Sequence, residues 1–259
     1  MPKIPSSVIQ GDCRSAIPRG SKYDFVFADP PFNIGQEYEG YYDSVSATTY
    51  EKFTREWIET ACNATNGVLA LHGPDNLVEP YLSLTREFGM HRIGWVLWHY
   101  RFGQCGRENW INSHCHCLIF SKHQNYTWNP DSVLVESDRV GYGDKRVVET
   151  ERGGRRVPLT VWGIPSDGPY WGRVTGGSKE RVPSRPNQLP EVYLERLIKA
   201  YTNKGDTVLD MFGGTGTTAV VAEALGRRWN IVELSTEGCT AIKTRLKRGA
   251  VRINQPSAP

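Results

Sequence analysis

Residues 206–218 read Asp-Thr-Val-Leu-Asp-Met-Phe-Gly-Gly-Thr-Gly-Thr-Thr, and this stretch decides the fold class. The apolar run that ends at Asp210 predicts a buried strand, and the run from Thr217 to Leu225 predicts a helix. The glycines between them permit a tight turn and let a ligand approach the backbone. A strand, a glycine-rich loop and a helix in this order are typical of an α/β domain that binds an adenosine-containing ligand.

An acidic residue, Glu233, ends the next predicted strand, which begins at Asn230. A carboxylate at this place can accept hydrogen bonds from the hydroxyls of a ribose. The pattern Gly214-x-Gly216-x-x-Ala219 also satisfies a relaxed dinucleotide fingerprint, so a nucleotide-dependent oxidoreductase stays open as an alternative. A P-loop is disfavoured because no Gly-Lys-Ser/Thr follows the glycines.

The rest of the chain alternates short apolar runs with helical patterns, which predicts a Rossmann-like α/β fold with helices on both faces of a mixed sheet. The expected strands are residues 7–10, 23–28, 67–73, 93–99, 116–120, 206–210 and 230–233, and the expected helices are residues 49–64, 77–88, 192–198, 217–225 and 236–248. We expect the first strand to lie beside the one ending at Glu233, and we expect residues 116–120 to form an antiparallel edge strand.

Periodicity fades between residues 123 and 186, where we expect an insertion of short irregular elements. Aromatic residues are expected to anchor it: Tyr126, Trp128, Tyr142, Trp162, Tyr170 and Trp171. From Arg139 to Arg185, ten Lys and Arg stand against five Asp and Glu, a charge of +5 in a chain of net charge +3. This local excess suits a polyanionic partner, although a solvated loop surface has the same pattern. Residues 1–122 and 187–250 would form the two parts of the main domain, and residues 251–259 a tail.

The composition excludes several classes of protein. No apolar run reaches the roughly 18 residues of a membrane span, and residues 1–20 lack the apolar core of a signal peptide, so we expect a cytoplasmic protein with no membrane partner. The six cysteines are too scattered for a disulfide scaffold. A zinc site is the alternative for one group: Cys105, His114, Cys115, His116 and Cys117. Its histidines and cysteines alternate along a strand and no Cys-x-x-Cys pair is present, so no metal is expected.

The motif Asp29-Pro30-Pro31-Phe32 directly follows the expected strand 23–28. Two prolines cannot continue a central strand, so the chain leaves the sheet at the carboxyl edge, where open α/β sheets bind ligands. Methylation of a base amine needs acceptors for the amine protons, because the nitrogen lone pair is otherwise delocalised into the ring. Asp29 and the carbonyl of Pro30 can accept them and stabilise the growing positive charge, and Phe32 offers a face for base stacking. Taken alone, the motif is also consistent with an ordinary turn.

These motifs together resemble those of the amino-methylating (N6-adenine/N4-cytosine) DNA methyltransferases, specifically their circularly permuted β class, over about residues 7 to 248. The resemblance implies an S-adenosylmethionine-dependent enzyme whose catalytic residues are Asp29, Pro30, Pro31 and Phe32. It implies a cofactor site formed by Asp12, Cys13, Asp29, Asp210, Phe212, Gly213, Gly214, Thr215, Gly216, Thr217, Thr218, Glu233 and Leu234. It also implies that residues 95–99 and 114–122 line the pocket of the target base and that residues 123–186 recognise the target.

The expected activity is therefore site-specific methylation of adenine N6 in double-stranded DNA, on a base that is flipped out of the duplex, as in restriction–modification systems of bacteria, archaea and phages. Related enzymes are often dimers, so the resemblance is compatible with a homodimer without requiring one. Residues 185–190, Arg-Pro-Asn-Gln-Leu-Pro, lack the His and Lys of the family pattern His-Pro-x-Gln-Lys-Pro, and Cys115 stands where the family often has Glu. Methylation of cytosine N4 or of RNA, and a catalytically weak DNA-binding relative, stay open as alternatives.

Overall fold

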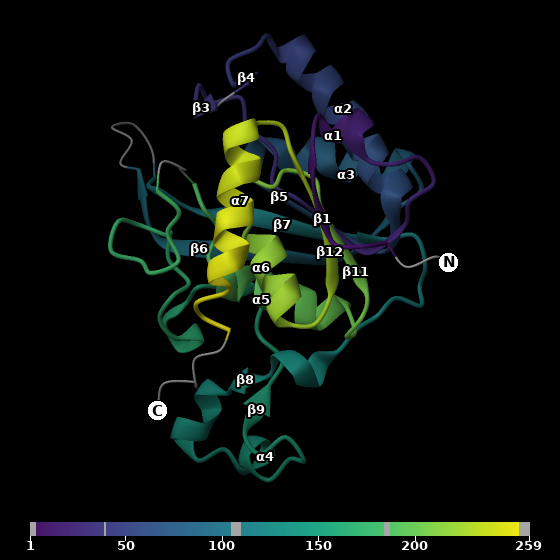
Figure 1. The fold of residues 1–259 in the computed structure, drawn as a ribbon. Helices are drawn as coiled ribbons and strands as arrows, with labels where there is room; N and C mark the ends of the chain where they lie inside the picture. The colour runs from purple at the N-terminus through teal and green to yellow at the C-terminus, as the bar shows by residue number, and fades with distance from the viewer. Residues whose placement is uncertain (1–3, 39, 105–109, 184–186, 254–259) are drawn as a thin grey trace.

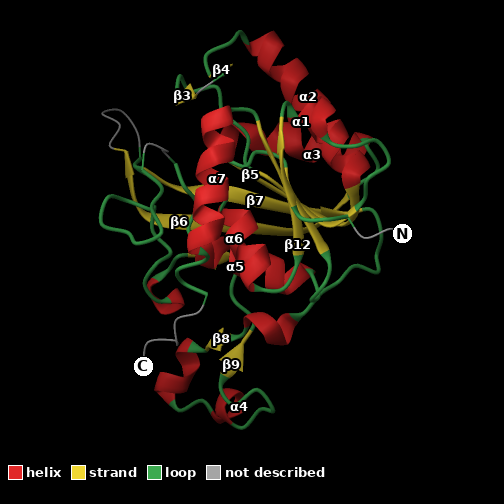
Figure 2. Ribbon diagram, viewed as in Figure 1, coloured by secondary structure: helices red, strands yellow, loops and turns green. Residues whose placement is uncertain are grey.

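A computed structural model describes residues 4–38, 40–104, 110–183 and 187–253. Its centre is an eight-stranded sheet with the strand order β1-β12-β11-β2-β5-β7-β6-β10, and helices cover both faces of this sheet (Figures 1 and 2). β7 runs antiparallel to its two neighbours, and the other strand pairs are parallel. The predicted mixed, Rossmann-like sheet is confirmed.

The sheet strands are β1 (Ser7–Gln10), β2 (Tyr23–Ala28), β5 (Thr65–Gly73), β6 (His91–Gln104), β7 (Asn112–Ser121), β10 (Val161–Trp162), β11 (Thr207–Asp210) and β12 (Arg228–Glu233). Two small ribbons pair β3 (Glu37–Tyr38) with β4 (Tyr41–Tyr42) and β8 (Val135–Glu136) with β9 (Arg155–Arg156). The α-helices are α1 (Cys13–Ala16), α2 (Ala47–Ala64), α3 (Val78–Glu87), α4 (Lys145–Val148), α5 (Glu191–Tyr201), α6 (Thr217–Ala224) and α7 (Thr236–Arg248). The 3-10 helices are η1 (Asp75–Leu77), η2 (Pro130–Val133), η3 (Asp138–Tyr142) and η4 (Pro165–Asp167). None of the helices in the described residues is long and apolar enough to cross a bilayer.

The two ends of the chain meet in the sheet as predicted. β1 pairs in parallel with β12, so that Gln10 lies opposite Glu233. β11 then joins β12 to β2, with Asp210 opposite both Ile231 and Phe27. The strands that carry the glycine loop and the Asp-Pro-Pro-Phe turn are therefore direct neighbours, although they are far apart in the sequence.

The predicted edge position of residues 116–120 is wrong. These residues belong to β7, which is antiparallel as expected but lies between β5 and β6. The physical reason is burial: Cys117 to Phe120 are all buried, as befits a strand covered on both faces. β6 alternates between buried and partly exposed positions and lies further out, where the two-residue β10 pairs with it.

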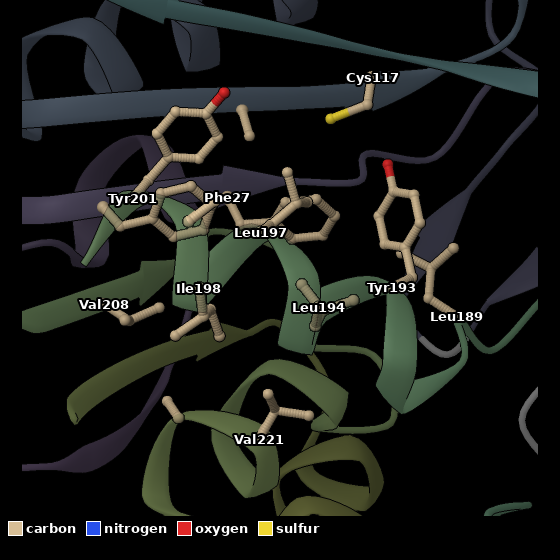
Figure 3. Packing of buried hydrophobic residues seen from close by; sticks show 14 of the residues in the cluster. Phe27, Cys117, Leu189, Tyr193, Leu194, Leu197, Ile198, Tyr201, Val208 and Val221 are labelled. Atoms are coloured by element: carbon tan, nitrogen blue, oxygen red, sulfur yellow. The ribbon is translucent and has the colours of Figure 1, made fainter. Parts of the chain in front are cut away.

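Two apolar cores fill the faces of the sheet. One lies under α5, α6 and α7 and contains Phe25 and Phe27, whereas the other lies under α2 and α3 and contains Val26 and Ala28. The alternation along β2 follows from the two-residue period of a strand. Figure 3 shows the first core, in which Tyr193 of α5 extends toward Phe27 and Cys117 of the sheet. This core reaches the carboxyl edge of the sheet and forms the floor under the candidate site.

The insertion expected over residues 123–186 extends along the molecule from the amino ends of the parallel strands to their carboxyl ends. Its first part is tied to the C-terminal end of α5, because the Asn129 side chain donates hydrogen bonds to the carbonyls of Lys199 (3.2 Å) and Thr202 (3.0 Å). β8, β9 and α4 form a small lobe at the bottom of Figure 1, opposite the β3–β4 ribbon that follows the carboxyl end of β2. Residues from Arg173 onward lie at that carboxyl edge, where they line the cavity described below.

The aromatic anchors of the insertion are fewer than predicted. Trp162 and Trp171 are buried, and the guanidinium of Arg196 lies 4.1 Å from the ring of Trp171 while it pairs with Asp167 at 2.8 Å. Tyr142, in contrast, is 88% exposed, so its predicted role as an anchor is wrong. The lobe of β8, β9 and α4 has too little buried surface around Tyr142 to enclose a phenol ring.

A buried ion pair between Glu191 and Arg245 joins α5 to α7. Their side chains are 0% and 1% exposed and approach to 3.0 Å. Arg245 also donates to the hydroxyl of Thr217 (2.7 Å) and the carbonyl of Thr215 (3.2 Å), so that it clamps the glycine loop. Glu191 accepts hydrogen bonds from the amides of Val251 and Arg252, which fasten the start of the predicted tail. The pair therefore holds three segments of chain at one point.

Replacing Arg245 by Met is predicted to lower the free energy of unfolding by about 3–5 kcal/mol, because it leaves the carboxylate of Glu191 buried without its cation. Urea unfolding followed by circular dichroism measures this loss. Lys247→Met, on an exposed position of the same helix, is the matched control and should change stability by no more than about 0.5 kcal/mol. A similar small loss for both variants would contradict the role given to this ion pair.

Candidate active site

A cavity of about 480 Å³ opens at the carboxyl edge of the sheet. Its volume lies in the range of small-molecule sites. It is lined by fifteen of the residues singled out in the sequence: Asp12, Cys13, Asp29, Pro30, Pro31, Phe32, Asp210, Phe212, Gly213, Gly214, Thr215, Thr217, Thr218, Glu233 and Leu234. Gly216 is not in the lining, because it packs against α7, where a Cβ would meet Ile242 at 2.9 Å. The Asp-Pro-Pro-Phe turn and the glycine loop thus share one cavity.

Hydrogen bonds with neighbouring residues fix the turn at Asp29 to Phe32. Tyr50 donates a hydrogen bond to the carbonyl of Pro31 (2.8 Å), and the buried carboxylate of Asp43 accepts hydrogen bonds from the amides of Asn33 (2.7 Å) and Ile34 (3.1 Å). No donor in the described part of the chain reaches the carbonyl of Pro30. A rigid turn therefore presents one unpaired carbonyl beside the Asp29 carboxylate.

The carboxyl group of Asp29 has no cationic partner among the described residues. Part of Asp29 is open to the cavity, but the surrounding protein excludes bulk water, and this burial together with the charge of Asp210 raises the pKa of Asp29 well above its ordinary value. Burial raises the pKa of Asp210 to about 7, against the opposing effect of hydrogen bonds from Thr218 and Phe212. No cation pairs with Asp29 within the described residues. The site is thus prepared for a positively charged or hydrogen-bond-donating ligand.

The glycine loop between β11 and α6 can adopt its conformation and packing only because its glycines carry no side chain. A Cβ on Gly213 would lie 2.4 Å from the side chain of Ile231, so the loop packs directly on β12. Gly214 has a φ of +50°, and its amide donates to the Glu233 carboxylate at 2.9 Å. Glu233 also accepts hydrogen bonds from the amide (3.0 Å) and hydroxyl (2.9 Å) of Ser235. These three bonds orient the carboxylate and leave part of its accepting capacity for a ligand.

Asp12 and Cys13 lie on the other side of the cavity, where β1 ends. The two oxygens of Asp12 accept hydrogen bonds from the Arg14 guanidinium, which lowers the pKa of Asp12. Asp12 also caps α1, because it accepts a bond from the amide of Arg14 (2.9 Å). Burial raises the pKa of the Cys13 thiol to about 12, so Cys13 contributes shape and a backbone amide rather than a reactive thiolate.

The far side of the cavity contains residues that sequence reasoning named only in part. Trp98 and Cys115, from the strand pair expected to line a base pocket, are in the lining, whereas Trp95 and His116 pack together on the opposite face of the sheet. Other lining residues were missed: Tyr38, His72, Tyr100, Arg173 and Asn187. The position of His72 at the end of an expected strand was the signal that sequence reasoning passed over.

Arg173 brings a cation from the insertion to the cavity. Its guanidinium lies 4.2 Å from the centre of the Tyr100 ring, a cation–π contact. Within the described residues no carboxylate forms an ion pair with it. Nothing in the local sequence distinguished Arg173 from the other basic residues of the insertion, because its position depends on the path of the chain.

One cluster of metal-ligating groups lies outside this cavity. His114, His116 and Asp75 bring their side chains together, with Nε2 of His116 at 2.6 Å from Asp75. The indole of Trp95 donates to Nδ1 of His116 (3.0 Å), so the proton of His116 lies on Nε2 and points to Asp75. A metal ion would have to displace this proton. Cys115 and Cys117 are on the other face and are free thiols, and Cys105 lies outside the described residues.

Residues 185–190, where the chain departs from the family pattern, are described from Asn187 onward. Gln188 accepts a hydrogen bond from the amide of Val182 (2.9 Å) and donates one to the carbonyl of Glu180 (2.9 Å). Leu189 is buried in the core under α5. The described part of this segment therefore fastens the insertion to α5.

Comparisons with known proteins agree with this geometry. Residues 23–244 match a family model described as DNA methylase. The type II methyltransferase M.HpaI of Haemophilus parainfluenzae is 30% identical over 227 residues, which cover 86% of this chain and 68% of that protein. The DNA adenine methyltransferase YhdJ of Escherichia coli (strain K12) is 28% identical over 255 residues, covering 93% and 82%.

Solved structures share the fold. The complex of M1.HpyAVI with SAM matches with a TM-score of 0.65 at 17% identity and covers 93% of this chain and 98% of that one. A PvuII DNA methyltransferase described as cytosine-N4-specific matches with a TM-score of 0.67 at 16% identity, covering 98% and 89%. At these identities the likeness concerns the course of the chain.

Asp29→Asn is predicted to stabilise the unliganded protein at pH 8 by about 1–2 kcal/mol. The raised pKa values of Asp29 and Asp210 mean that the folded state binds protons more tightly than the unfolded state, so stability falls as the pH rises from about 4 through about 7. A neutral amide at position 29 removes part of this loss.

Urea unfolding at pH 5 and pH 8 measures the effect, and the gain should be smaller at pH 5. Asp131→Asn, at an exposed carboxylate, is the control and should show no such dependence on pH. Destabilisation by Asp29→Asn at pH 8 would show that the carboxylate is compensated in the folded protein.

Proposed function

Because the chain belongs to the family of amino-methylating DNA methylases, which use S-adenosylmethionine, we propose that it methylates N6 of adenine at a short specific sequence in double-stranded DNA. One observation carries this proposal: the Asp-Pro-Pro-Phe turn and the glycine loop with Glu233 line the same cavity. A nucleotide-dependent oxidoreductase would use the glycine loop but would have no need for an unpaired carboxylate and carbonyl at the facing turn.

The residues around the glycine loop fit S-adenosylmethionine. Glu233 would accept the ribose hydroxyls, since its carboxylate is oriented by Gly214 and Ser235 and retains free accepting capacity. Phe212 would pack against the adenine, and the α1 turn at Asp12 would close that end of the cavity. The carboxyl groups of Asp29 and Asp210, whose pKa values are raised because no cation compensates their burial, suit a ligand that carries a positive charge. When bound, the sulfonium supplies an activated methyl group that needs no metal ion.

The turn would prepare the base amine for transfer. Asp29 and the carbonyl of Pro30 are two acceptors that need no rearrangement, and they would bind the two amine protons and bias the nitrogen toward a usable lone pair. The same acceptors would stabilise the positive charge that develops on that nitrogen. The ring of Phe32 would stack on the base, a contact worth about 1–3 kcal/mol in comparable sites. Tyr50 and Asp43 fix the turn, so this geometry exists before the base arrives.

The base amine is hidden in duplex DNA, so the target would have to be flipped out of the stack into the cavity. Arg173 would contact a phosphate next to the flipped base, since it offers a cation at the mouth of the site. The basic lobe around η3 and α4 lies at the other edge of the sheet (Figure 1), so its arginines would contribute mainly long-range attraction to the polyanion. A homodimer stays compatible with the resemblance to related enzymes.

Adenine is proposed over cytosine on two grounds. The catalytic motif begins with Asp, which in this family is associated with adenine, and the relative YhdJ is named an adenine methyltransferase. Cytosine N4 is the second candidate, favoured by the likeness to the cytosine-N4-specific PvuII enzyme. The absence of the family's His and Lys from residues 185–190 would favour a weak enzyme, which a direct assay distinguishes.

Incubation of the protein with DNA and methyl-labelled S-adenosylmethionine is predicted to label the DNA. Enzymatic digestion and mass spectrometry of the nucleosides should identify N6-methyladenine. Label in N4-methylcytosine would transfer the proposal to the other amine, and label in RNA but not DNA would exclude a DNA substrate. Binding of DNA without label would identify a non-catalytic relative.

Asp29→Ala and Glu233→Gln are predicted to separate catalysis from cofactor binding. Asp29→Ala should lower kcat at least 100-fold, because it removes an acceptor needed in the transition state, and it should weaken cofactor binding less than Glu233→Gln does. Glu233→Gln should weaken cofactor binding about 10- to 100-fold through the loss of charged hydrogen bonds. Isothermal titration and steady-state kinetics measure the two effects, with Lys247→Met as the control. Near-normal turnover of Asp29→Ala would refute the role of that carboxylate.

A further inference from the structure

His72 lies beside the catalytic turn, although the proposed mechanism does not use it. Ala28 of β2 pairs with Leu71 of β5, so the next residues, Asp29 just after β2 and His72 within β5, lie side by side. His72 is 2% exposed and lines the cavity. Its ring lies 6.5 Å from the ring of Phe32 and 5.8 Å from that of Trp98. A base stacked on Phe32 would therefore have its edge near this imidazole.

The hydrogen bonding of His72 determines which ring nitrogen carries the proton. Nδ1 lies 2.9 Å from the hydroxyl of Tyr193, which is fully buried on α5. Cys117 is the other polar group near that hydroxyl, and a thiol is a much weaker acceptor than an imidazole nitrogen. The phenol therefore donates to Nδ1, and the proton of the neutral imidazole is on Nε2. Burial lowers the pKa of His72 to about 3, which keeps the ring neutral and makes it a poor base.

Nε2 of His72 has no hydrogen-bond partner from the protein. Within the described residues nothing accepts a hydrogen bond from it, and it is not among the fully enclosed polar atoms that lack a partner, so this N–H is open to a ligand that enters the cavity. Tyr193 keeps the ring from rotating, because rotation would break the hydrogen bond between Nδ1 and the Tyr193 hydroxyl. The fold thus holds one fixed N–H donor in the wall of the cavity beside the acceptor group of Asp29.

We propose that His72 is a specificity-determining residue whose Nε2–H donates to the ring nitrogen next to the exocyclic amine of the flipped base, N1 in adenine. This rests on the proposed function and adds the discrimination of base type. Asp29 and Pro30 accept from the amine, and His72 donates to its neighbour, so the site reads a donor–acceptor pair on the Watson–Crick edge. Guanine and thymine carry a carbonyl and an N–H at these two places. Each would set acceptor against acceptor and donor against donor, and both would be rejected.

The decisive experiment compares base analogues in a duplex that contains the enzyme's own site, mapped beforehand by sequencing DNA that it has methylated. The target adenine is replaced by 1-deazaadenine, which lacks the proposed acceptor, or by 7-deazaadenine, which keeps it. Wild type should lose about 5- to 100-fold in kcat/KM with the 1-deaza base and change little with the 7-deaza base. If the product is N4-methylcytosine, 3-deazacytosine takes the place of 1-deazaadenine.

The variant His72→Phe keeps a flat ring and removes the donor. It should lose a similar factor on natural DNA and should lose nothing further with the 1-deaza base, since the two changes remove the same hydrogen bond. Tyr193→Phe removes the hydroxyl that fixes the tautomer of His72, so it should weaken this coupling. His72→Gln retains an N–H donor and should recover part of the activity. Cofactor affinity, measured by titration, should be unaffected in each variant.

Additive losses for His72→Phe and the 1-deaza base, or equal activity of wild type on both deaza bases, would overturn the assignment while the proposed function stands. No methyl transfer to the natural duplex would overturn both. The comparison of deaza bases in wild type requires no variant, so it decides the matter even if His72→Phe does not fold.

Discussion

The parallel pairing of β2 with β11 is the constraint on which the rest of the site depends. It places two carboxylates, Asp29 and Asp210, at the ends of neighbouring strands from opposite parts of the chain. Burial raises the pKa values of both, and the charge of Asp210 adds to the rise at Asp29. A protein selected only for stability would remove such a pair. Its retention indicates that the folded chain is completed by a ligand, as expected where functional sites carry strain.

Asp29 and Asp210 lower the stability of the folded chain, and interactions close to them stabilise it. Arg245 and Glu191 form a buried ion pair that clamps the glycine loop to the start of α5. The same α5 supplies Tyr193, which fixes His72, and packs along the core shown in Figure 3. One helix therefore supports both the loop proposed for the cofactor and the wall proposed for the base. Contacts of α5 therefore connect the two halves of the cavity.

Local sequence signals predicted well those elements whose limits are set by local chemistry. The strands 7–10 and 23–28 and the helix 236–248 were placed to the residue, because Gly11, the two prolines and Gly249 end them. The interior position of β7 was missed, since strand order depends on burial of both faces and not on a single apolar run. The contributions of His72 and Arg173 were missed because each depends on a partner distant in sequence, Tyr193 and Tyr100 respectively.

Residues 187–190, the described part of the segment that departs from the family pattern, are anchored to the rest of the protein. The Gln of that pattern is present in this chain as Gln188. It ties the insertion to the chain before α5 by two hydrogen bonds. Leu189, which stands where the family has Lys, is buried in the apolar core, so a charge at that position would have to be desolvated. Leu189 is thus held by packing, and the Glu191–Arg245 pair follows directly after it. The described end of this segment is thus held by the protein itself, which leaves the carboxylates of the cavity free for the ligands.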